Sequence, residues 1–294
     1  MSQVNVLPGL AKPISYQTIA DTVIILRTRN LDEPQRRFLR SLTGNSGIQV
    51  AVAVDETVGL VDVGEYRKIS VTVAACQELG LHCPDDFAWR NGDYNLYLAR
   101  KAFPAARYFW MIEPDVEHSF ASFEQLIALF DDMPEVDLVS SHLVPADREW
   151  YWQRTIKDRS VSVQRCFFPL IRISSRAIDI CLKQRQRDRF SLHARLFWPN
   201  DEALVATTVT RARLRVADLN GAGVSVYNES SFGYEPLDGD DGWFRGGVNQ
   251  VYHPVLYGDA YRARLARQAG AMADPFMRRV RRKLQKLMRA YMPF

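Results

Sequence analysis

Residues 22–29 read TVIILRTR, a short run of β-branched and aliphatic residues that ends in charged ones. Such a run is typical of a strand that is buried on both faces of a sheet. Residues 48–54, IQVAVAV, repeat the pattern after a glycine-containing break, and Pro34 falls in the first turn of the helix expected between the two runs. The sequence therefore predicts two buried strands joined by a helix.

This alternation of strand and helix continues to about residue 145. Further strands are expected over 107–112 and 137–141, and helices over 70–80, 93–103 and 120–132. The order predicts an α/β fold with a mostly parallel, doubly wound central sheet flanked by helices. Later elements follow a looser pattern, with strands expected over 163–173 and 214–218, helices over 174–187, 200–211, 259–268 and 275–291, and a mobile Gly- and Asp-rich loop over 233–247.

The composition is that of a globular protein with a sizeable core: of 294 residues, 47% are hydrophobic and 24% are charged, and the net charge is +4. Residues 275–294 carry basic side chains and no acidic one, so the rest of the chain is close to neutral and a nucleic-acid partner is not expected. The four cysteines lack C-x-x-C spacing and are expected to be free thiols. We see no signal-peptide pattern and no apolar run near the ~18 residues of a membrane span, so we expect a cytoplasmic protein.

Two carboxylates, Glu113 and Asp115, follow the apolar strand predicted over 107–112, with Pro114 between them. In open α/β sheets, ligands bind beyond the carboxyl ends of the strands. Mg²⁺ and Mn²⁺ are held by one or two carboxylates together with phosphate oxygens, and such a cation neutralises the charge on a departing nucleoside diphosphate. The structural alternative is an acidic turn that is only solvated.

The segments TVIILRTRN (22–30), IQVAVAVDET (48–57) and RYFWMIEPDV (107–116) resemble, in order and spacing, the N-terminal half of GT-A-type glycosyltransferases, which use nucleotide sugars. The resemblance implies a GT-A-like catalytic domain over 1–272, with a nucleotide-binding half at about 20–145 and an acceptor half at about 146–258. It also implies that Asp115 and Glu113 bind a metal and the diphosphate. The sequence departs from the family's D-x-D pattern, because the first acid is Glu and a proline separates the two.

By the same resemblance, polar residues at the strand ends and before the acidic turn contact the nucleotide, the donor sugar or the diphosphate: Arg27, Thr28, Arg29, Asp55, Arg90 and Asp93. The residues themselves also allow structural roles. Asp55 and Asp93 can cap the turn or helix that follows them, and the arginines can pair with acids nearby in the sequence.

The segment WPNDEALVAT (198–207) is similar to the P-D-E segment that opens the catalytic-base helix in some GT-A transferases. On that match Glu202 takes the proton of the acceptor hydroxyl, and Asp201 is the alternative base. A carboxylate suits this position because it accepts the proton and stabilises an oxocarbenium-like centre. The structural alternative is a helix capped by Asn200, with acids favoured in its first turn.

His253 follows the Gly- and Asp-rich loop, at the point where metal-dependent members of the family often place a histidine that completes the metal shell. Imidazole suits Mn²⁺ better than Mg²⁺. Trp243 and Arg245 lie in the loop itself and are implied donor contacts when such a loop closes. A lone histidine is otherwise more often structural.

Residues 273–294 are expected to form a basic amphipathic helix, with apolar side chains at helical spacing on one side. Such a helix suits an anionic lipid surface and predicts peripheral contact with the inner face of the plasma membrane. Docking on the chain's own domain or on a partner subunit is the alternative.

The resemblance, taken with these features, implies a metal-assisted glycosyltransferase that acts in bacterial surface polysaccharide synthesis, with an inverting reaction favoured and a retaining one left open. The donor is a nucleoside-diphosphate sugar, with UDP favoured by its frequency in the family, and the acceptor is a hydroxyl of a glycan or glycolipid. Two alternatives stay open: a sugar nucleotidyltransferase, although the LRTRN segment lacks the glycine-rich phosphate loop of that class, and a catalytically inactive GT-A-like glycan-binding or scaffold protein. A dinucleotide-dependent oxidoreductase is disfavoured because no G-x-G-x-x-G follows the first strand.

Overall fold

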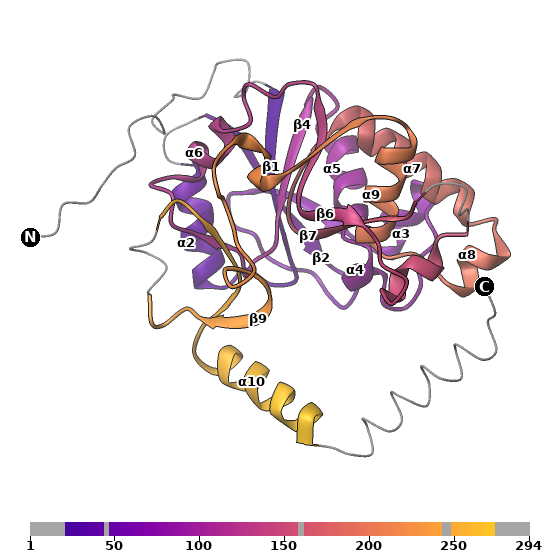
Figure 1. Ribbon diagram of the computed structural model, residues 1–294. Coiled ribbons are helices and arrows are strands. Elements are labelled where there is room, and N and C mark those ends of the chain that lie inside the picture. The colour runs from indigo at the N-terminus through magenta and orange to yellow at the C-terminus, as the bar shows by residue number, and fades with distance from the viewer. Residues whose placement is uncertain (1–20, 44–46, 158–161, 243–247, 274–294) are drawn as a thin grey trace, which may run out of the picture.

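The computed structural model describes residues 21–43, 47–157, 162–242 and 248–273. Within these residues the main sheet has seven strands in the order β3-β2-β1-β4-β7-β6-β8 (Figure 1). The strands are β1 (Thr22–Thr28), β2 (Gln49–Asp55), β3 (Arg67–Val71), β4 (Tyr108–Ile112), β6 (Val136–Pro145), β7 (Gln164–Ser174) and β8 (Arg215–Asp218). Neighbouring strands are parallel except where β7 meets β4 and β6. The predicted mostly parallel central sheet is confirmed.

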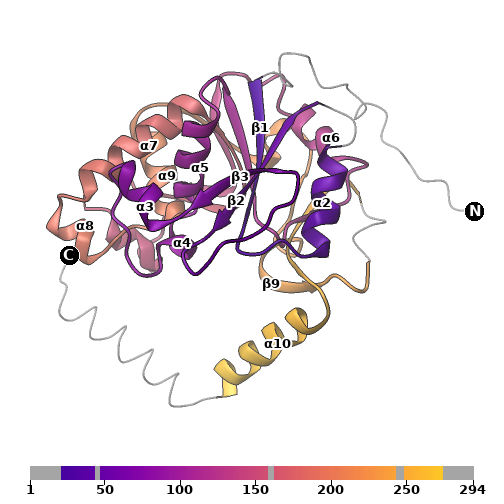
Figure 2. The same ribbon diagram turned by 180° about the vertical axis from the view of Figure 1, so that it is seen from behind.

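Helices cover both faces of this sheet, as Figures 1 and 2 show. Successive residues of β1 point to opposite faces, so that Val23 and Ile25 pack in one apolar cluster while Ile24 and Leu26 pack on the other side. One face carries α3 (Val73–Glu78), α4 (Phe87–Arg90), α5 (Asp93–Ala102), α7 (Ser175–Asp188) and α9 (Asp201–Arg211), and the other carries α2 (Glu33–Thr43) and α6 (Phe123–Ala128). The predicted doubly wound arrangement is therefore also confirmed.

A small sheet of three strands, in the order β5-β10-β9, lies beside the acidic turn. Its strands are β5 (Glu117–His118), β9 (Phe232–Asp238) and β10 (Val251–Leu256). Strand β10 runs antiparallel to β5, and the amide of Val255 donates to the carbonyl of Asp115 at 2.8 Å. This pairing places residues 251–256 beside the turn that follows β4.

Several expected elements differ from those in the structure. The expected helix over 70–80 is wrong at its start, because Ile69 and Val71 belong to strand β3 and Thr72 then caps α3. The expected loop over 233–247 is wrong over its first part, where β9 pairs with β10. Elements that we did not predict are α4, β5, β10, the 3-10 helices η1 (Tyr151–Thr155) and η2 (Leu219–Ala222), and α8 (Leu192–Leu196).

The last described element is α10 (Gly258–Ala273), which contains the helix expected over 259–268. The further helix expected over 275–291, and with it most of the amphipathic segment 273–294, lies outside the described residues. Among the residues that the structure describes, no helix is long and apolar enough to cross a membrane. The division into one domain over 1–272 and a C-terminal helix stays a prediction.

A buried ion pair joins the helices on one face of the sheet. Arg185 of α7 donates from Nε and Nη2 to the two carboxylate oxygens of Asp93 in α5, at 2.7 and 2.9 Å, and both side chains are fully buried. Tyr97 donates to the same carboxylate at 2.7 Å, and Arg185 Nη1 donates to the carbonyl of Pro199 at 2.8 Å. These bonds connect α5 and α7 to the residues that precede α9.

We expect Arg185→Met to lower the free energy of unfolding by about 3–5 kcal/mol, because the change leaves the Asp93 carboxylate buried without its cation. Urea-induced unfolding followed by circular dichroism measures the change. Arg187→Met is the matched control, since Arg187 is an exposed residue of the same helix. A loss no larger than that of the control would contradict a structural role for the pair.

Candidate functional site

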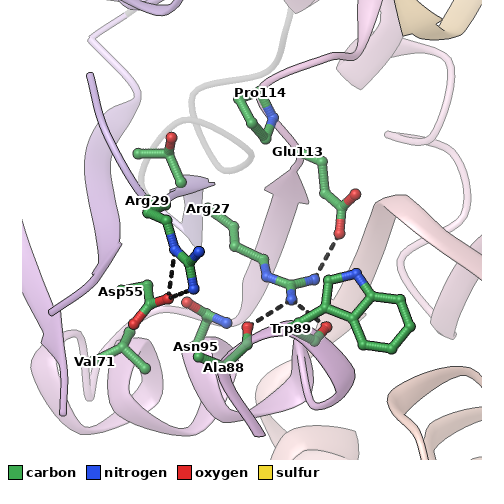
Figure 3. A pocket seen from close by; sticks show the side chains of 10 residues that line it. Arg27, Arg29, Asp55, Val71, Ala88, Trp89, Asn95, Glu113 and Pro114 are labelled. Carbon is green, nitrogen blue, oxygen red and sulfur yellow. Dashed lines mark hydrogen bonds and ion pairs between the residues drawn. The ribbon is translucent and has the colours of Figure 1, made fainter. Parts of the chain in front are cut away.

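The carboxyl ends of β1, β2 and β4 border a cavity of about 400 Å³, shown in Figure 3. Its lining residues are Arg27, Thr28, Arg29, Asp55, Val71, Ala88, Trp89, Asn95, Glu113 and Pro114. Four of them, Arg27, Thr28, Arg29 and Asp55, are predicted nucleotide contacts. They meet here because parallel strands end at the same edge of a sheet.

Asp55 is held at one side of this cavity. Its Oδ2 accepts from Nε and Nη2 of Arg29 at 3.1 and 2.9 Å, and its Oδ1 accepts from the amide and hydroxyl of Thr57 at 3.0 and 2.6 Å. Partial burial raises the pKa of Asp55, but the bonds from Thr57 and Arg29 outweigh it and hold the pKa below its usual value. Asp55 is therefore a carboxylate at neutral pH and can accept hydrogen bonds from hydroxyl groups in the cavity.

The side chain of Arg27, a residue of β1, extends to helix α4. Its Nη2 donates to the carbonyls of Ala88 and Trp89 at 2.9 and 2.7 Å, and its Nη1 donates to Oε1 of Glu113 at 2.6 Å (Figure 3). The same Nη1 lies 3.9 Å from Oδ2 of Asp201. Arg27 thus presents a fixed positive charge between carboxylates from two distant parts of the sequence.

Glu113, Asp115 and His253 bring one possible ligand atom each to within 4.8 Å of one another. His253 Nδ1 lies 3.0 Å from the carbonyl of Gly233, which can only accept, so that in the neutral imidazole Nδ1 carries the proton and Nε2 presents its lone pair. This Nε2 lies 3.5 Å from Oδ1 of Asp115. Two carboxylates and a correctly oriented imidazole form a donor set that fits Mn²⁺ and, less well, Mg²⁺.

The pKa of Asp115 also reflects this crowding. Burial raises its pKa, His253 lowers it, and the neighbouring Glu113 raises it again, so that the result lies above the usual value. A divalent cation among the three side chains would relieve the repulsion between the two carboxylates.

A second cavity, of about 260 Å³, adjoins the first. Arg27, Trp89 and Glu113 line both cavities, so the Arg27–Glu113 ion pair stands in their common wall. The other lining residues are Arg90, Trp150, Trp152, Phe167, Phe168, Pro169, Asn200, Asp201, Glu202, Tyr234 and His253. Both predicted catalytic bases and the predicted metal ligand His253 therefore line the second cavity.

Asp201 and Glu202 open helix α9, which Asn200 caps by accepting from the amide of Ala203 at 3.0 Å. Asp201 Oδ2 accepts from the amide of Gly92 at 2.7 Å, and its Oδ1 accepts from the amide of Glu202 at 2.8 Å. Both oxygens of Asp201 thus have backbone partners. Glu202 Oε2 accepts from Nδ2 of Asn200 at 3.1 Å. Glu202 also accepts a hydrogen bond from the backbone of Phe168, and both carboxyl groups line the second cavity.

Burial is the main reason why both carboxyl groups hold their protons unusually tightly. It raises the pKa of Glu202 to about 8, and the Asp201 carboxylate adds to the effect. It raises the pKa of Asp201 to about 7, against the opposing charge of Arg27. A pKa near neutrality is what a general base needs in order to accept a proton and release it again.

The predicted donor contact of Asp93 is not supported by its position, because Asp93 is fully buried and both of its oxygens bind Arg185. Arg90 does line the second cavity, where it pairs with Asp86. Trp243 and Arg245 lie outside the described residues.

Several lining residues were missed by the sequence analysis: Trp89, Asn95, Trp150, Trp152, Phe167 and Tyr234. The pair Trp150 and Trp152 gave a signal, since two tryptophans so close together in a polar stretch are uncommon in a buried core. The other aromatic residues gave no signal, because most aromatic residues belong to the core and the sequence does not show which of them line a cavity.

Gly92 is required by the close approach of Arg27 and Asp201. A Cβ atom at this position would lie 2.5 Å from Nη1 of Arg27 and 2.6 Å from Oδ2 of Asp201. We expect Gly92→Ala to lower the free energy of unfolding by about 1–3 kcal/mol and to weaken nucleotide binding, as measured by urea unfolding and calorimetry.

Gly59→Ala is the control for this substitution, because a Cβ atom there meets nothing within 4 Å. If Gly92→Ala behaves like Gly59→Ala in both measurements, the contact between Gly92, Arg27 and Asp201 is not important for the site.

No protein-family model matches the sequence, and a comparison with curated proteins gives no match. Similar solved structures include a glycosyltransferase involved in the glycosylation of the major capsid of PBCV-1, with 10% identity over 79% of this chain and 92% of that one and a TM-score of 0.40. Core-mannan synthase A from Aspergillus fumigatus, in an Mn/GDP form, has 11% identity over 71% of this chain and 75% of that one, also with a TM-score of 0.40. Likeness at this level concerns only the general course of the chain.

Proposed function

We propose that the chain is a metal-assisted glycosyltransferase that moves a sugar from a nucleoside-diphosphate sugar to a hydroxyl of a glycan or glycolipid. One observation carries the proposal: Glu113, which clusters with Asp115 and His253, lines two adjoining cavities, one bordered by polar strand ends and the other by His253 and a buried carboxylate of raised pKa. A two-substrate transfer needs this arrangement, with a charged leaving group on one side and a base on the other.

The first cavity is the donor site in this proposal. Asp55 accepts hydrogen bonds from the nucleoside, and Arg27 faces the diphosphate from the wall between the cavities. Glu113, Asp115 and His253 hold Mn²⁺ or Mg²⁺, which when bound neutralises negative charge on the leaving diphosphate. UDP is our first choice of nucleotide.

Glu202 is the base in the second cavity. The acceptor oxygen attacks the anomeric carbon while the bond from that carbon to the diphosphate oxygen breaks, and the hydroxyl proton passes to the Glu202 carboxylate. Attack from the side opposite the diphosphate inverts the anomeric configuration. Asp201 positions Glu202 through the hydrogen bond that it accepts from the Glu202 amide.

We further propose that the reaction serves the synthesis of a bacterial surface polysaccharide on the cytoplasmic side of the membrane. The basic residues of the segment 275–294 support a peripheral contact with anionic lipid, because that segment contains no acidic side chain. A lipid-linked acceptor would then lie on the same membrane surface as the protein.

Asp115→Ala should remove the metal-dependent part of nucleotide binding, because it deletes one of the two carboxylates of the cluster. We expect UDP or GDP to stabilise the wild-type protein more strongly with Mn²⁺ than without it, and the variant to lose this increment, at least tenfold in Kd or about 1.4 kcal/mol. Thermal-shift assays followed by calorimetry measure both quantities.

Glu149→Ala is the control for charge alone, since Glu149 is an exposed carboxylate that lines neither cavity. If no nucleotide binds the wild-type protein more tightly with Mn²⁺, or if Asp115→Ala behaves like the control, the metal site has been assigned to the wrong residues.

Glu202→Gln should reduce kcat by about 10²–10⁴-fold while donor binding stays unchanged, because the amide keeps the shape of the side chain but cannot take the proton. Release of the nucleoside diphosphate on acceptor addition measures turnover, and calorimetry measures donor binding. Turnover at the wild-type rate would show that a residue other than Glu202 is the base.

A further inference from the structure

Phe, Trp and Tyr side chains line the second cavity at six positions, and none of them holds the metal or moves the proton in the proposed function. Beside Trp89, Phe167 and Phe168 they include Trp150, Trp152 and Tyr234. Trp150 and Trp152 are half-buried, and Tyr234 is 66% exposed although it stands at the cavity. Below we call these three side chains the aromatic wall.

The aromatic wall is held in place by packing behind it. Trp150 and Trp152 rest on a small apolar cluster formed by Ile156, Val163 and Ala203, the last of which belongs to α9. The Cζ atom of Arg90 lies 5.6 Å from the centre of the Trp152 ring, within range of a cation–π interaction. The wall is therefore positioned relative to Glu202, which precedes Ala203 directly.

Tyr234 is positioned from the metal side. Its ring lies edge-on against Phe167, with the ring centres 4.9 Å apart, and Phe167 lies 5.1 Å from the ring of His253. Such edge-to-face contacts are favourable for aromatic pairs. Phe167 thus connects the ring of Tyr234 to the ring of His253 in the metal cluster.

Beside apolar residues such as Phe167, Phe168 and Pro169, several polar groups share this cavity with the aromatic wall. Arg90, Asn200, Asp201 and Glu202 line the same space. A lipid chain in the cavity would cover these groups without forming hydrogen bonds, which is costly for buried polar atoms. A pyranose ring suits both kinds of surface, because it presents C–H groups on its faces and hydroxyl groups at its edge.

The volume sets how much of a carbohydrate can enter. About 260 Å³ lies just below the ~300–1,000 Å³ that is usual for small-molecule sites. The cavity therefore has room for one sugar ring.

We propose that Trp150, Trp152 and Tyr234 form a subsite for the terminal sugar ring of the acceptor. The ring lies against the aromatic wall and directs one hydroxyl toward Glu202, while the rest of the acceptor stays outside the cavity. This inference rests on the proposed function, since it identifies the acceptor of that reaction as a pyranose and rules out a lipid or peptide hydroxyl in the cavity.

The test uses the full chain with Mn²⁺ and UDP or GDP, and the methyl pyranosides of the common hexoses and N-acetylhexosamines as probes. Saturation-transfer NMR identifies a bound pyranoside, and titration gives its Kd. We expect Trp152→Ala to weaken this Kd at least tenfold and Trp152→Phe, which keeps an aromatic face, to retain most of the binding. Phe190→Ala is the matched control, because Phe190 is 76% exposed and lines neither cavity.

A second arm tests the one-ring limit. Di- and trisaccharides that end in the preferred pyranose should bind within about threefold of the methyl pyranoside, since only the terminal ring is held. Affinity that rises tenfold or more with chain length would overturn the single-ring subsite.

The subsite and the proposed function can fail separately. The subsite is overturned, and the donor site is retained, if the protein shows metal-dependent nucleotide binding but binds no pyranoside. The same conclusion follows if Trp152→Ala and Phe190→Ala bind the pyranoside equally well. Pyranoside binding that depends on Trp152, in a protein that binds no nucleotide, supports the subsite and overturns the transferase.

Discussion

The site depends on one guanidinium group placed among several carboxylates. Arg27 leaves the end of β1, gives Nη2 to two carbonyls of α4, and turns Nη1 toward Glu113 at 2.6 Å and Asp201 at 3.9 Å. An arginine suits this place because its planar group donates in several fixed directions at once. The close approach also requires the absence of a side chain at Gly92. Arg27 thereby connects the end of the first strand, the acidic turn and the start of α9.

One arginine does not balance the negative charge that this edge of the sheet collects. Burial raises the pKa values of Asp201 and Glu202 to about 7 and about 8, so the protein holds protons where it lacks cations. A divalent ion among Glu113, Asp115 and His253 would add the missing positive charge on the donor side and favour the ionised form of the base. The charge of a bound metal ion would then influence whether the carboxyl group of the proposed base is ionised.

The strands and helices of the first half were largely predictable, because buried strands such as β1, β2 and β4 each contain a continuous apolar run of at least four residues. Two of the missed strands, β3 and β9, are edge strands, whereas the missed strand β10 is buried in the middle of the small sheet and contains a proline. Strand β3 is half-exposed at the edge of the main sheet, and β9 belongs to a small sheet with a Gly- and Asp-containing sequence, so neither shows a clear apolar period. The aromatic wall was missed for another reason, since aromatic residues in a sequence do not reveal whether they line a cavity or fill the core.

The sequence by itself determined which residue types end each buried strand, and therefore where carboxylates and arginines would gather along the edge of a parallel sheet. Only the tertiary structure decided which of them meet. The pairing of β10 with β5 brings His253 to Asp115, whereas the bond with Arg185 withdraws Asp93 into the core. In the proposed function, the backbone contacts of both Asp201 oxygens make Asp201 the residue that positions Glu202. Such choices rest on contacts between segments far apart in the chain, and local sequence does not encode those distances.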